Sequence, residues 1–298
     1  MIEFSPVKLS DKKWVSDILS ARRFYTCEYT FGNIFSYTAK FPIEIAKVGG
    51  CLISKCHTAE GIEYCYPIGD GDKKQAIEFV LSDAEKCGTG FEIFGIDPEG
   101  ANELTTLFPE RFDLFLSRDD FDYIYLTEDL ITLKGKKYQP KRNHISYFKK
   151  NFNWSYERIT PENITECLAM SEKWILQQSE ERHYALRQEL EIIKKIFDNY
   201  AELGYVGGLL RKDGEVIAYT MGERMTNEMF CTHIEKAFSD IRGAYPMINQ
   251  LFAENELSGY KYVDREDDVG EENLRKAKLS YHPVILAEKY TARLKNAD

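Results

Sequence analysis

Apolar and polar positions in the first 130 residues switch between helical and strand-like spacing. Trp14 and Ile18 lie one turn apart on a predicted helix, and Val48-Gly49-Gly50 is expected to form the turn between two strands. The predicted order is a helix over 11–19, a strand-like pattern over 25–67, a helix over 73–87 that ends at Gly88, a strand over 91–96, a short helix around 102–107 and a strand around 121–126. We interpret residues 1–130 as one domain.

A similar order of elements returns after residue 130, which predicts a second domain over residues 131–298. The boundary rests on this repeated order, because no flexible linker marks it. Thr160 and Pro161 suit the N-cap and first position of a helix, and Lys212-Asp213-Gly214 suits a hairpin turn. The predicted order is a helix from 160, a helix from 190 to near 204, strands over 206–210, 215–221 and 229–235, a helix up to 257, a strand over 260–263, a short helix and a last strand.

Charge and cysteine content narrow the class of protein. The formal net charge of -10 argues against a protein that is coated with nucleic acid. A local basic surface is still compatible with this net charge. The seven cysteines are odd in number and no two are spaced Cys-x-x-Cys, so we expect reduced thiols and a cytoplasmic protein. No His lies at ligand spacing from a pair of cysteines, and we predict no metal site.

Neither export nor membrane insertion is indicated by the sequence. The first residues lack a basic start followed by an apolar core, as a signal peptide would have. No run approaches the roughly 20 apolar residues that a membrane-spanning helix needs.

The segment 134–150 is basic in an otherwise acidic chain. It contains seven Lys and Arg residues, while Ile145, Phe148 and Phe152 recur at helical spacing. An ordinary solvated face is one interpretation. The other is a surface that contacts the phosphates of tRNA or an anionic headgroup. Its most site-like residues follow Pro140, and they are Arg142, Asn143 and His144.

Two loops near the C-terminus contain further candidate residues. One ends in Arg242-Gly243-Ala244 where a helix is predicted to begin, and N–H groups at a helix N-terminus suit an anion or a polarised carbonyl. The other follows the strand 260–263 directly with five charged residues. Open α/β sheets place ligands at such strand ends, although a solvated acidic loop remains the alternative.

The order strand, loop, helix, strand over residues 229–263 resembles the acyl-coenzyme A binding half of GNAT-type N-acyltransferases. In those proteins the loop holds a pyrophosphate, with the pattern Gln or Arg, two residues, Gly, one residue, Gly or Ala. Gly243 matches the central Gly, but Asp240 and Tyr245 take the outer positions. Because an acidic residue repels pyrophosphate and Tyr is bulky, the resemblance implies the fold with a damaged coenzyme A site.

Several segments together resemble the soluble family assigned to the phosphatidylglycerol lysyltransferase C-terminal domain. The resemblance implies an α+β fold of two tandem GNAT-like domains, each with a mixed, mainly antiparallel sheet flanked by helices. It also implies transfer of an aminoacyl group from charged tRNA, without a cofactor. The matching segments are 29–35, 134–144, 233–237, 241–245, 264–267 and 274–283.

The resemblance places the active site in the second domain. Glu235 is expected where two parallel strands separate, as a base or as an anchor for an amine, with a salt bridge as the alternative. His233, two residues back, is expected on the same face, although a core histidine is the alternative role. The candidate catalytic residues are Glu235, Asp264 and Tyr281. The candidate substrate-binding residues are Arg142, Asn143, His144, His233, Arg242, Gly243, Tyr245, Arg265, Glu266, Asp267, Arg275, Lys276, Lys278 and His282.

Three functions stay open from the sequence. The first is transfer of an aminoacyl group to an amine or a lipid hydroxyl, in which residues 134–150 would contact tRNA and the acidic loop the amino acid. The acceptor would be a small molecule or a lipid headgroup. The second is N-acetylation with acetyl-coenzyme A as cofactor, and the third is binding of a small ligand without catalysis.

Overall fold

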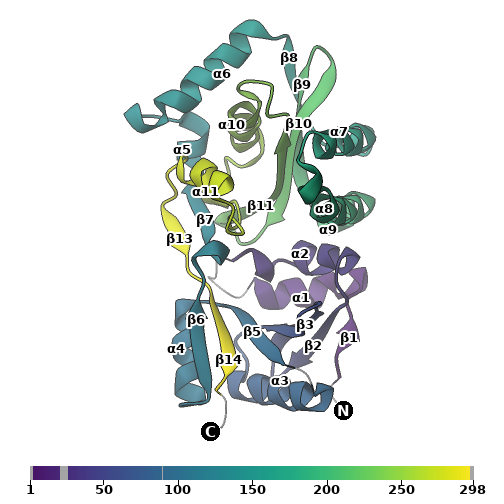
Figure 1. Cartoon of the computed structure of the whole chain (residues 1–298), viewed down its shortest axis with the longest axis vertical. Coiled ribbons are helices and arrows are strands. Elements are labelled where there is room, and N and C mark those ends of the chain that lie inside the picture. Colours follow the sequence, from purple (N-terminus) through teal and green to yellow (C-terminus); the bar gives the residue numbers. More distant parts are fainter. Residues whose placement is uncertain (1–2, 21–25, 89, 296–298) are drawn as a thin grey trace. The chain divides into compact units, whose positions relative to one another are not determined.

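The chain folds into two compact units. The computed structural model describes residues 3–20, 26–88 and 90–295, and its ribbon is shown in Figure 1. Unit 1 comprises residues 1–122, 267–275 and 286–298, and unit 2 comprises residues 123–266 and 276–285. Each unit is built on a seven-stranded mixed sheet. Two segments of the expected second domain, 267–275 and 286–298, therefore lie in unit 1.

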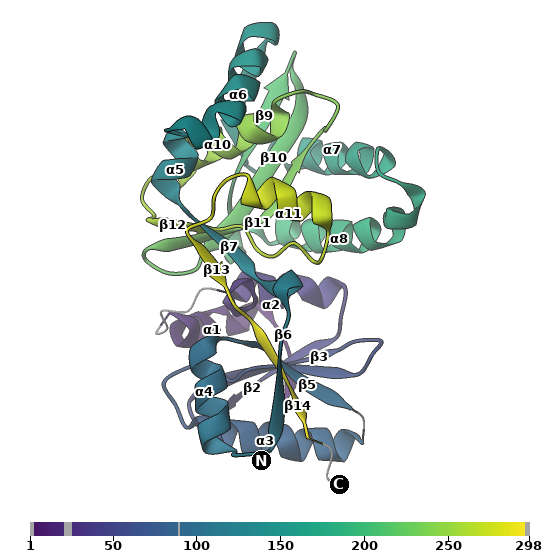
Figure 2. The same ribbon diagram turned by 60° about the vertical axis from the view of Figure 1, so that its left-hand side comes forward.

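The sheet of unit 1 has the strand order β1-β2-β3-β4-β5-β14-β6. Strands β4 and β5 pair in parallel, and the other neighbours pair antiparallel. Figure 2 shows β14, the last strand of the chain, running beside β6. The strands are β1 (Ser5–Pro6), β2 (Ile43–Val48), β3 (Cys51–His57), β4 (Ile62–Cys65), β5 (Phe91–Ile96), β6 (Phe112–Leu116) and β14 (Tyr290–Leu294).

The helices of unit 1 follow from clear local signals. Helix α1 (Lys12–Leu19) agrees with the predicted first helix. Helix α3 (Lys73–Cys87) begins after Asp72, whose side chain accepts a hydrogen bond from the Gln75 N–H, and ends at Gly88 with φ of 64°. Helix α4 (Pro98–Leu107) packs with α3 into one hydrophobic core against the sheet.

The strand-like interpretation of residues 25–67 was wrong in part. Residue 25 lies outside the described residues, and helix α2 (Phe31–Ser36) follows soon after it. The Thr30 hydroxyl caps this helix by accepting a hydrogen bond from the Asn33 N–H at 3.3 Å. Phe31, Ile34 and Phe35 are buried at helical spacing, so the apolar residues suit one face of a helix as well as a strand.

The sheet of unit 2 has the order β13-β7-β12-β11-β10-β9-β8. We had assigned the strand near 121–126 to the first domain, but it is β7 and pairs antiparallel with β12 in the second sheet. The spacing of apolar residues identifies a strand and does not specify its partner. The strands are β7 (Asp122–Leu126), β8 (Trp154–Arg158), β9 (Val206–Lys212), β10 (Glu215–Arg224), β11 (Met229–Ala237), β12 (Tyr262–Asp264) and β13 (Ile285–Ala287).

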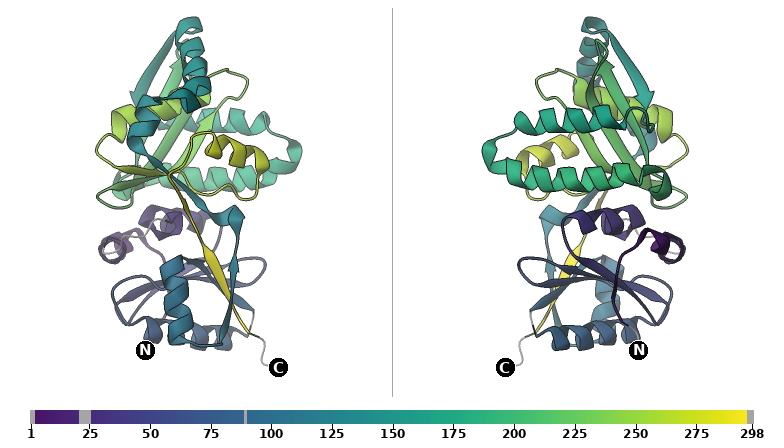
Figure 3. Two further views of the ribbon diagram at one scale, coloured as in Figure 1. Left: turned by 90° about the vertical axis from the view of Figure 1, so that its left-hand side faces the viewer. Right: turned by 90° about the vertical axis from the view of Figure 1, so that its right-hand side faces the viewer.

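Helices cover both faces of this second sheet. Ser171 of α7 contacts Tyr219 on one face (Oγ to Oη, 2.6 Å), and Glu189 of α8 accepts a hydrogen bond from Lys236 on that face at 2.9 Å. Helix α10 packs on the other face, as Figures 1 and 3 show. The helices are α5 (Thr127–Thr132), α6 (Gln139–Asn151), α7 (Ile164–Leu176), α8 (Glu180–Asp198), α9 (Tyr200–Leu203), α10 (Ala244–Glu256) and α11 (Glu272–Leu279).

Helix α7 begins later than its sequence signals indicate. Thr160 and Pro161 were predicted to open it, but they form a turn and Asn163 is the N-cap. The Asn163 carboxamide oxygen accepts a hydrogen bond from the Thr160 N–H at 2.9 Å. The Asn163 side chain therefore closes the turn before the helix, and the helix begins after this turn.

A bulge in β11 decides which way its polar side chains face. Ile234 pairs with Met221 and Thr232 with Gly222 on β10, which leaves His233 as an extra residue. Before the bulge Cys231 pairs with Glu223, and after it Glu235 pairs with Thr220. Positions 220 and 223 of β10 face opposite sides of the sheet, so Cys231 and Glu235 do as well. His233 contacts the Glu223 side chain, so it lies on the side of Cys231. The expectation that His233 and Glu235 share a face was therefore wrong, because it assumed a regular strand.

Strands β11 and β12 stop pairing just before the bulge. Their parallel pairing ends at Cys231 and Asp264, whereas β11 continues to Ala237. Glu235 therefore lies where the two parallel strands no longer pair, as expected from the GNAT resemblance.

Candidate functional site

The centre of the candidate site in unit 2 is the ion pair of Glu235 and Arg265. One Glu235 oxygen accepts a hydrogen bond from Arg265 Nη2 at 2.8 Å, and the other accepts one from the Asn249 amide at 3.0 Å. The side chains of Arg265 and Glu235 are 10% and 14% exposed. Burial opposes the charge of Arg265, but the Glu235 carboxylate raises its pKa. The guanidinium is therefore held as a fixed cation.

Two tyrosines and one lysine surround this guanidinium. Its central carbon lies 5.4 Å from the ring centroid of Tyr125 and 4.7 Å from that of Tyr281, which is cation–π distance. Lys141 Nζ lies 3.9 Å from the Tyr281 centroid. Burial, together with the positive charge of Arg265, lowers the pKa of Lys141 to about 8. About half of this amine is therefore neutral at pH 8 and about a tenth at pH 7.

Two polar atoms beside Glu235 retain hydrogen-bonding capacity. Arg265 Nη1 and Asn249 Oδ1 are both buried, and neither has a hydrogen-bond partner among the described residues. A buried donor without a partner costs free energy. Such atoms mark places where a substrate group or a water completes the network.

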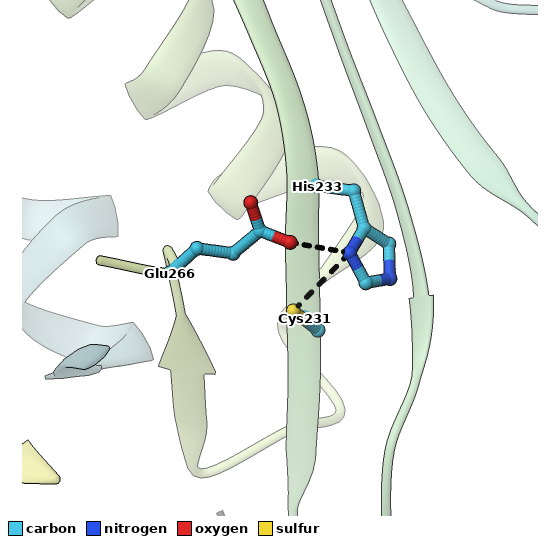
Figure 4. A group of neighbouring side chains, drawn as sticks. All are labelled: Cys231, His233 and Glu266. Atoms are coloured by element: carbon cyan, nitrogen blue, oxygen red, sulfur yellow. Dashed lines mark hydrogen bonds and ion pairs between the residues drawn. The ribbon is translucent and has the colours of Figure 1, made fainter. Parts of the chain in front are cut away.

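A second polar cluster lies around the bulge residue His233. Its Nδ1 is 2.7 Å from a Glu266 oxygen and 3.6 Å from Cys231 Sγ, as Figure 4 shows. Its Nε2 is 3.2 Å from a Glu223 oxygen. Burial opposes the charge of His233, but hydrogen bonds to Glu223 and Glu266 raise its pKa to about 10. His233 is thus an imidazolium between two carboxylates.

The charged loop after β12 is held by local hydrogen bonds. The fully buried Asp264 accepts one from the Glu266 N–H at 2.8 Å, and Glu266 has a φ of 57°. Lys278 Nζ donates to the carbonyl oxygens of Arg265 and Glu266, at 2.6 and 3.1 Å. Asp264 and Lys278 therefore set the backbone that presents Arg265.

Residues 142–144 lie on helix α6. Arg142 donates to the carbonyl oxygens of Leu133 and Gly135, so it closes the loop before the helix. Asn143 and His144 are exposed. The structure does not bring their side chains to Glu235.

The loop before α10 packs against helix α6. Gly243 is the N-cap with φ of 93°, and a Cβ at this position would lie 2.5 Å from the His144 carbonyl oxygen. Arg242 is exposed, with its guanidinium carbon 4.4 Å from the centroid of the Tyr147 ring. Tyr245 lies in the first turn of α10, and burial raises its pKa. The predicted anion site is thus formed by backbone that is closely covered by α6.

The remaining predicted site residues lie elsewhere. In unit 1, Arg275 binds the buried Asp268 through two nitrogens, at 2.9 and 2.6 Å, and Asp267 Oδ2 is 4.0 Å from Lys289 Nζ. In unit 2, Lys276 and His282 are exposed. None of these four residues has a described contact with Glu235 or Arg265.

Sequence reasoning missed three members of the Arg265 cluster. Tyr125 lies on β7, which we had placed in the other domain. Asn249 lies in the middle of helix α10, whose polar residues we had not considered. Lys141 was noted as one of seven basic residues of segment 134–150. Its distance of one turn from Ile145, a buried residue, was the signal that it faces inward.

The fold, with its splayed parallel strands, is the tandem GNAT-like fold. A tandem GNAT protein from the clavulanic acid biosynthesis pathway superposes with a TM-score of 0.52 at 11% identity over all of both chains. The chain belongs to the family described as phosphatidylglycerol lysyltransferase, C-terminal, which matches residues 20–293.

Two further solved structures are similar to this chain. A conserved protein of unknown function from Bacteroides thetaiotaomicron VPI-5482 is 36% identical, with a TM-score of 0.94 over 99% of this chain and 100% of that one. A C-terminal domain assigned to a lysylphosphatidylglycerol synthetase of Agrobacterium fabrum has a TM-score of 0.70 at 14% identity, over 97% of this chain and 92% of that one. At that identity the second likeness shows the fold alone.

A curated relative covers less of the chain. An uncharacterized protein of Mycoplasmoides gallisepticum is 25% identical to this chain over 183 residues. The match takes in 58% of this chain and 56% of the relative, so it spans little more than half of that protein's length.

Within the described ranges, no helix has the length and apolar content needed to cross a membrane.

Proposed function

We propose that this protein transfers an aminoacyl group from a charged tRNA to an amine or hydroxyl acceptor, with Arg265 at the reacting centre. The observation that carries the proposal is the buried Arg265 guanidinium. Its Nη1 lacks a hydrogen-bond partner in the described part of the chain. The amine of Lys141, with its lowered pKa, contacts the same Tyr281 ring as Arg265.

This arrangement suits attack on an ester that is already activated. As the acceptor attacks, negative charge develops on the carbonyl oxygen, and a fixed guanidinium donor stabilises it. The acceptor must also lose a proton, which a lysine amine with a pKa near working pH accepts. Glu235 is already engaged by Arg265 and Asn249. We therefore assign Glu235 the role of positioning Arg265, and Lys141 the role of base.

The charge of helix α6 supports tRNA as the donor. Lys149 and Lys150 at its end are exposed, as are Lys134, Lys136 and Lys137 just before it. Exposed lysines bind phosphates with little sequence preference. Since Lys141 belongs to the same helix, a tRNA backbone held by these lysines would approach the Arg265 cluster.

The coenzyme A alternative is disfavoured by the packing at Gly243. A pyrophosphate requires close approach to the loop backbone. Helix α6 already lies so close to Gly243 that a Cβ at this position would be 2.5 Å from the His144 carbonyl oxygen. Asp240 is exposed in the same loop and adds negative charge.

The test is a transfer assay with tRNA charged with radiolabelled amino acids, scanned over the amino acids and over amine and lipid acceptors. We expect label to move from tRNA to an acceptor, and Arg265→Met to abolish transfer. The matched control is Arg211→Met, because Arg211 is also a mostly buried arginine of unit 2 that binds two carboxylates, Glu157 and Glu166.

Two results would overturn the proposal. Transfer that survives in the folded Arg265→Met protein would remove Arg265 from the reacting centre. Micromolar binding of acetyl-coenzyme A in a calorimetric titration, with no transfer from any charged tRNA, would make the protein an N-acetyltransferase.

A further inference from the structure

The cluster around His233 has the donors of a metal site. Cys231 supplies a thiol sulfur, His233 an imidazole nitrogen and Glu266 a carboxylate oxygen, and these three atoms lie within 4.8 Å of one another. Figure 4 shows the Glu266 oxygen and the Cys231 sulfur both directed at His233 Nδ1. We infer that Cys231, His233 and Glu266 bind a zinc ion, with Glu223 holding the histidine in place. This inference is independent of the proposed function.

The distances agree with tetrahedral zinc for two of the three donors. Zinc lies about 2.3 Å from sulfur and about 2.0 Å from an imidazole nitrogen, which puts sulfur and nitrogen about 3.5 Å apart at a tetrahedral angle. Cys231 Sγ and His233 Nδ1 are 3.6 Å apart. The Glu266 oxygen, 2.7 Å from Nδ1, would move back to about 3.3 Å. The Glu266 side chain is 23% exposed, and this leaves room for that movement.

Glu223 supplies the feature that accompanies metal-binding histidines. Such a histidine usually donates the N–H of its other ring nitrogen to a carboxylate, which fixes its tautomer and ring orientation. His233 Nε2 lies 3.2 Å from a Glu223 oxygen, and Glu223 is itself buried. Nδ1 is therefore the nitrogen left for the metal.

Charge balance also permits the ion. Before binding, the cluster has two carboxylates, an imidazolium and a thiol. Zinc would displace the thiol proton and the proton between His233 and Glu266, so two protons leave as two positive charges enter. The buried region keeps its net charge, and no uncompensated charge is created. A soft thiolate with an imidazole and a carboxylate favours zinc over magnesium or calcium.

A similar set of donors in unit 1 shows what distinguishes this cluster. Cys27, Glu28 and Asp122 also lie close together, but Lys289 Nζ is between them, at 2.6 Å from Glu28 and 2.9 Å from Asp122. An ammonium group already supplies the positive charge at that place. In the cluster of Cys231, His233 and Glu266, the positive charge comes from the proton between His233 and Glu266, and a metal ion can replace a proton.

The pattern of residues explains why the sequence did not indicate this site. We predicted no metal site because we searched for a pair of cysteines near a histidine. Cys231 and His233 are two residues apart on one strand, and Glu266 comes from the loop after the neighbouring strand.

The experiment is titration of the whole chain, stripped with a chelator, with zinc by calorimetry and with cobalt(II) by absorbance. We expect one equivalent of zinc to bind, and cobalt to give a thiolate-to-metal charge-transfer band that Cys231→Ser removes. Cys27→Ser is the matched control and should leave the band unchanged. Glu223→Gln should weaken zinc binding by about 10- to 100-fold.

Circular dichroism would show whether each variant is folded. If Cys231→Ser does not fold, Glu266→Gln takes its place and should lower zinc affinity and shift the ligand-field bands of cobalt. The inference is overturned if the stripped protein binds no zinc at micromolar concentration. It is equally overturned if the cobalt band persists in Cys231→Ser or disappears in Cys27→Ser.

Discussion

Replacing Arg265 by Met should destabilise unit 2 chiefly by leaving Glu235 without its cation. Both side chains are largely buried, and removing one partner of a buried ion pair costs about 3–5 kcal/mol. Glu235 would still accept the hydrogen bond from Asn249, and it is partly exposed. We therefore expect a loss of about 3 kcal/mol, at the lower end of that range.

This loss corresponds to a measurable thermal shift. For a unit of about 150 residues, 1 kcal/mol lowers Tm by about 2–4 °C, so the expected shift is about 6–12 °C. The assay is thermal unfolding followed by circular dichroism. Limited proteolysis near Tm would report which unit opens first, since the two units need not unfold together.

A double variant separates the ion pair from other effects of the substitution. In Glu235→Gln with Arg265→Met the carboxylate is gone, so most of the lost stability should return. Transfer should stay abolished, because the guanidinium donor is still missing. A single variant that shifts Tm by less than about 2 °C, or a double variant no more stable than the single one, would refute the energetic role given to this pair.

Three further perturbations test other parts of the structure. Burial lowers the pKa of Lys141 to about 8, against 10.5 for an ordinary lysine. Below pH 8 the buried amine is charged and destabilises the fold, so the free energy of unfolding should rise between pH 8 and 10.5. A series of Tm measurements over this pH range should show the rise in the unmodified protein and not in Lys141→Met. Transfer should rise with pH through about 8 in the same comparison. Lys289→Met should cost unit 1 about 3–5 kcal/mol, and Asp122→Asn added to it should restore part of the Tm. Gly243→Ala should cost about 1–3 kcal/mol, and more than Gly135→Ala. Both glycines have φ of 93°, but only at Gly243 would the added Cβ collide with backbone, the His144 carbonyl oxygen. Equal Tm values for the two variants would contradict the close packing of α6.

The fold was predictable from the sequence to the level of elements, but not to the level of sheet membership. Strands β2 and β3 followed from a turn signal, and α3 from its cap residues and Gly88. The exchange of β7 and β14 was not predictable, because both read as ordinary short strands. Which sheet a strand joins depends on partners more than 100 residues away, such as the pairing of β14 with β5 and β6.

The candidate site was predictable where a single segment contained it. Glu235 and Arg265 were singled out because each belongs to a charged or polar stretch beside a buried strand, and the structure joins them by a hydrogen bond. Asn249 and Lys141 were not singled out, because each is one polar residue on a helix with an ordinary apolar face. The bulge at His233 was invisible to a period-two pattern, since one inserted residue leaves the residue types unchanged.

The contacts of the charged loop also change which group of a substrate the site suits. We interpreted residues 264–268 as a binding site for the amine of an amino acid. In the structure each carboxylate already has a local role: Asp264 caps the turn, Glu266 holds His233, Asp267 accepts from the Val269 N–H, and Asp268 binds Arg275. An amine would have to displace one of these partners. Arg265 Nη1 is a buried donor that has no hydrogen-bond partner among the described residues, and the nearby Lys141 adds a second basic group. A carbonyl oxygen, a carboxylate or a phosphate therefore suits this place better than an ammonium group, and competition by anions rather than by amines should inhibit transfer.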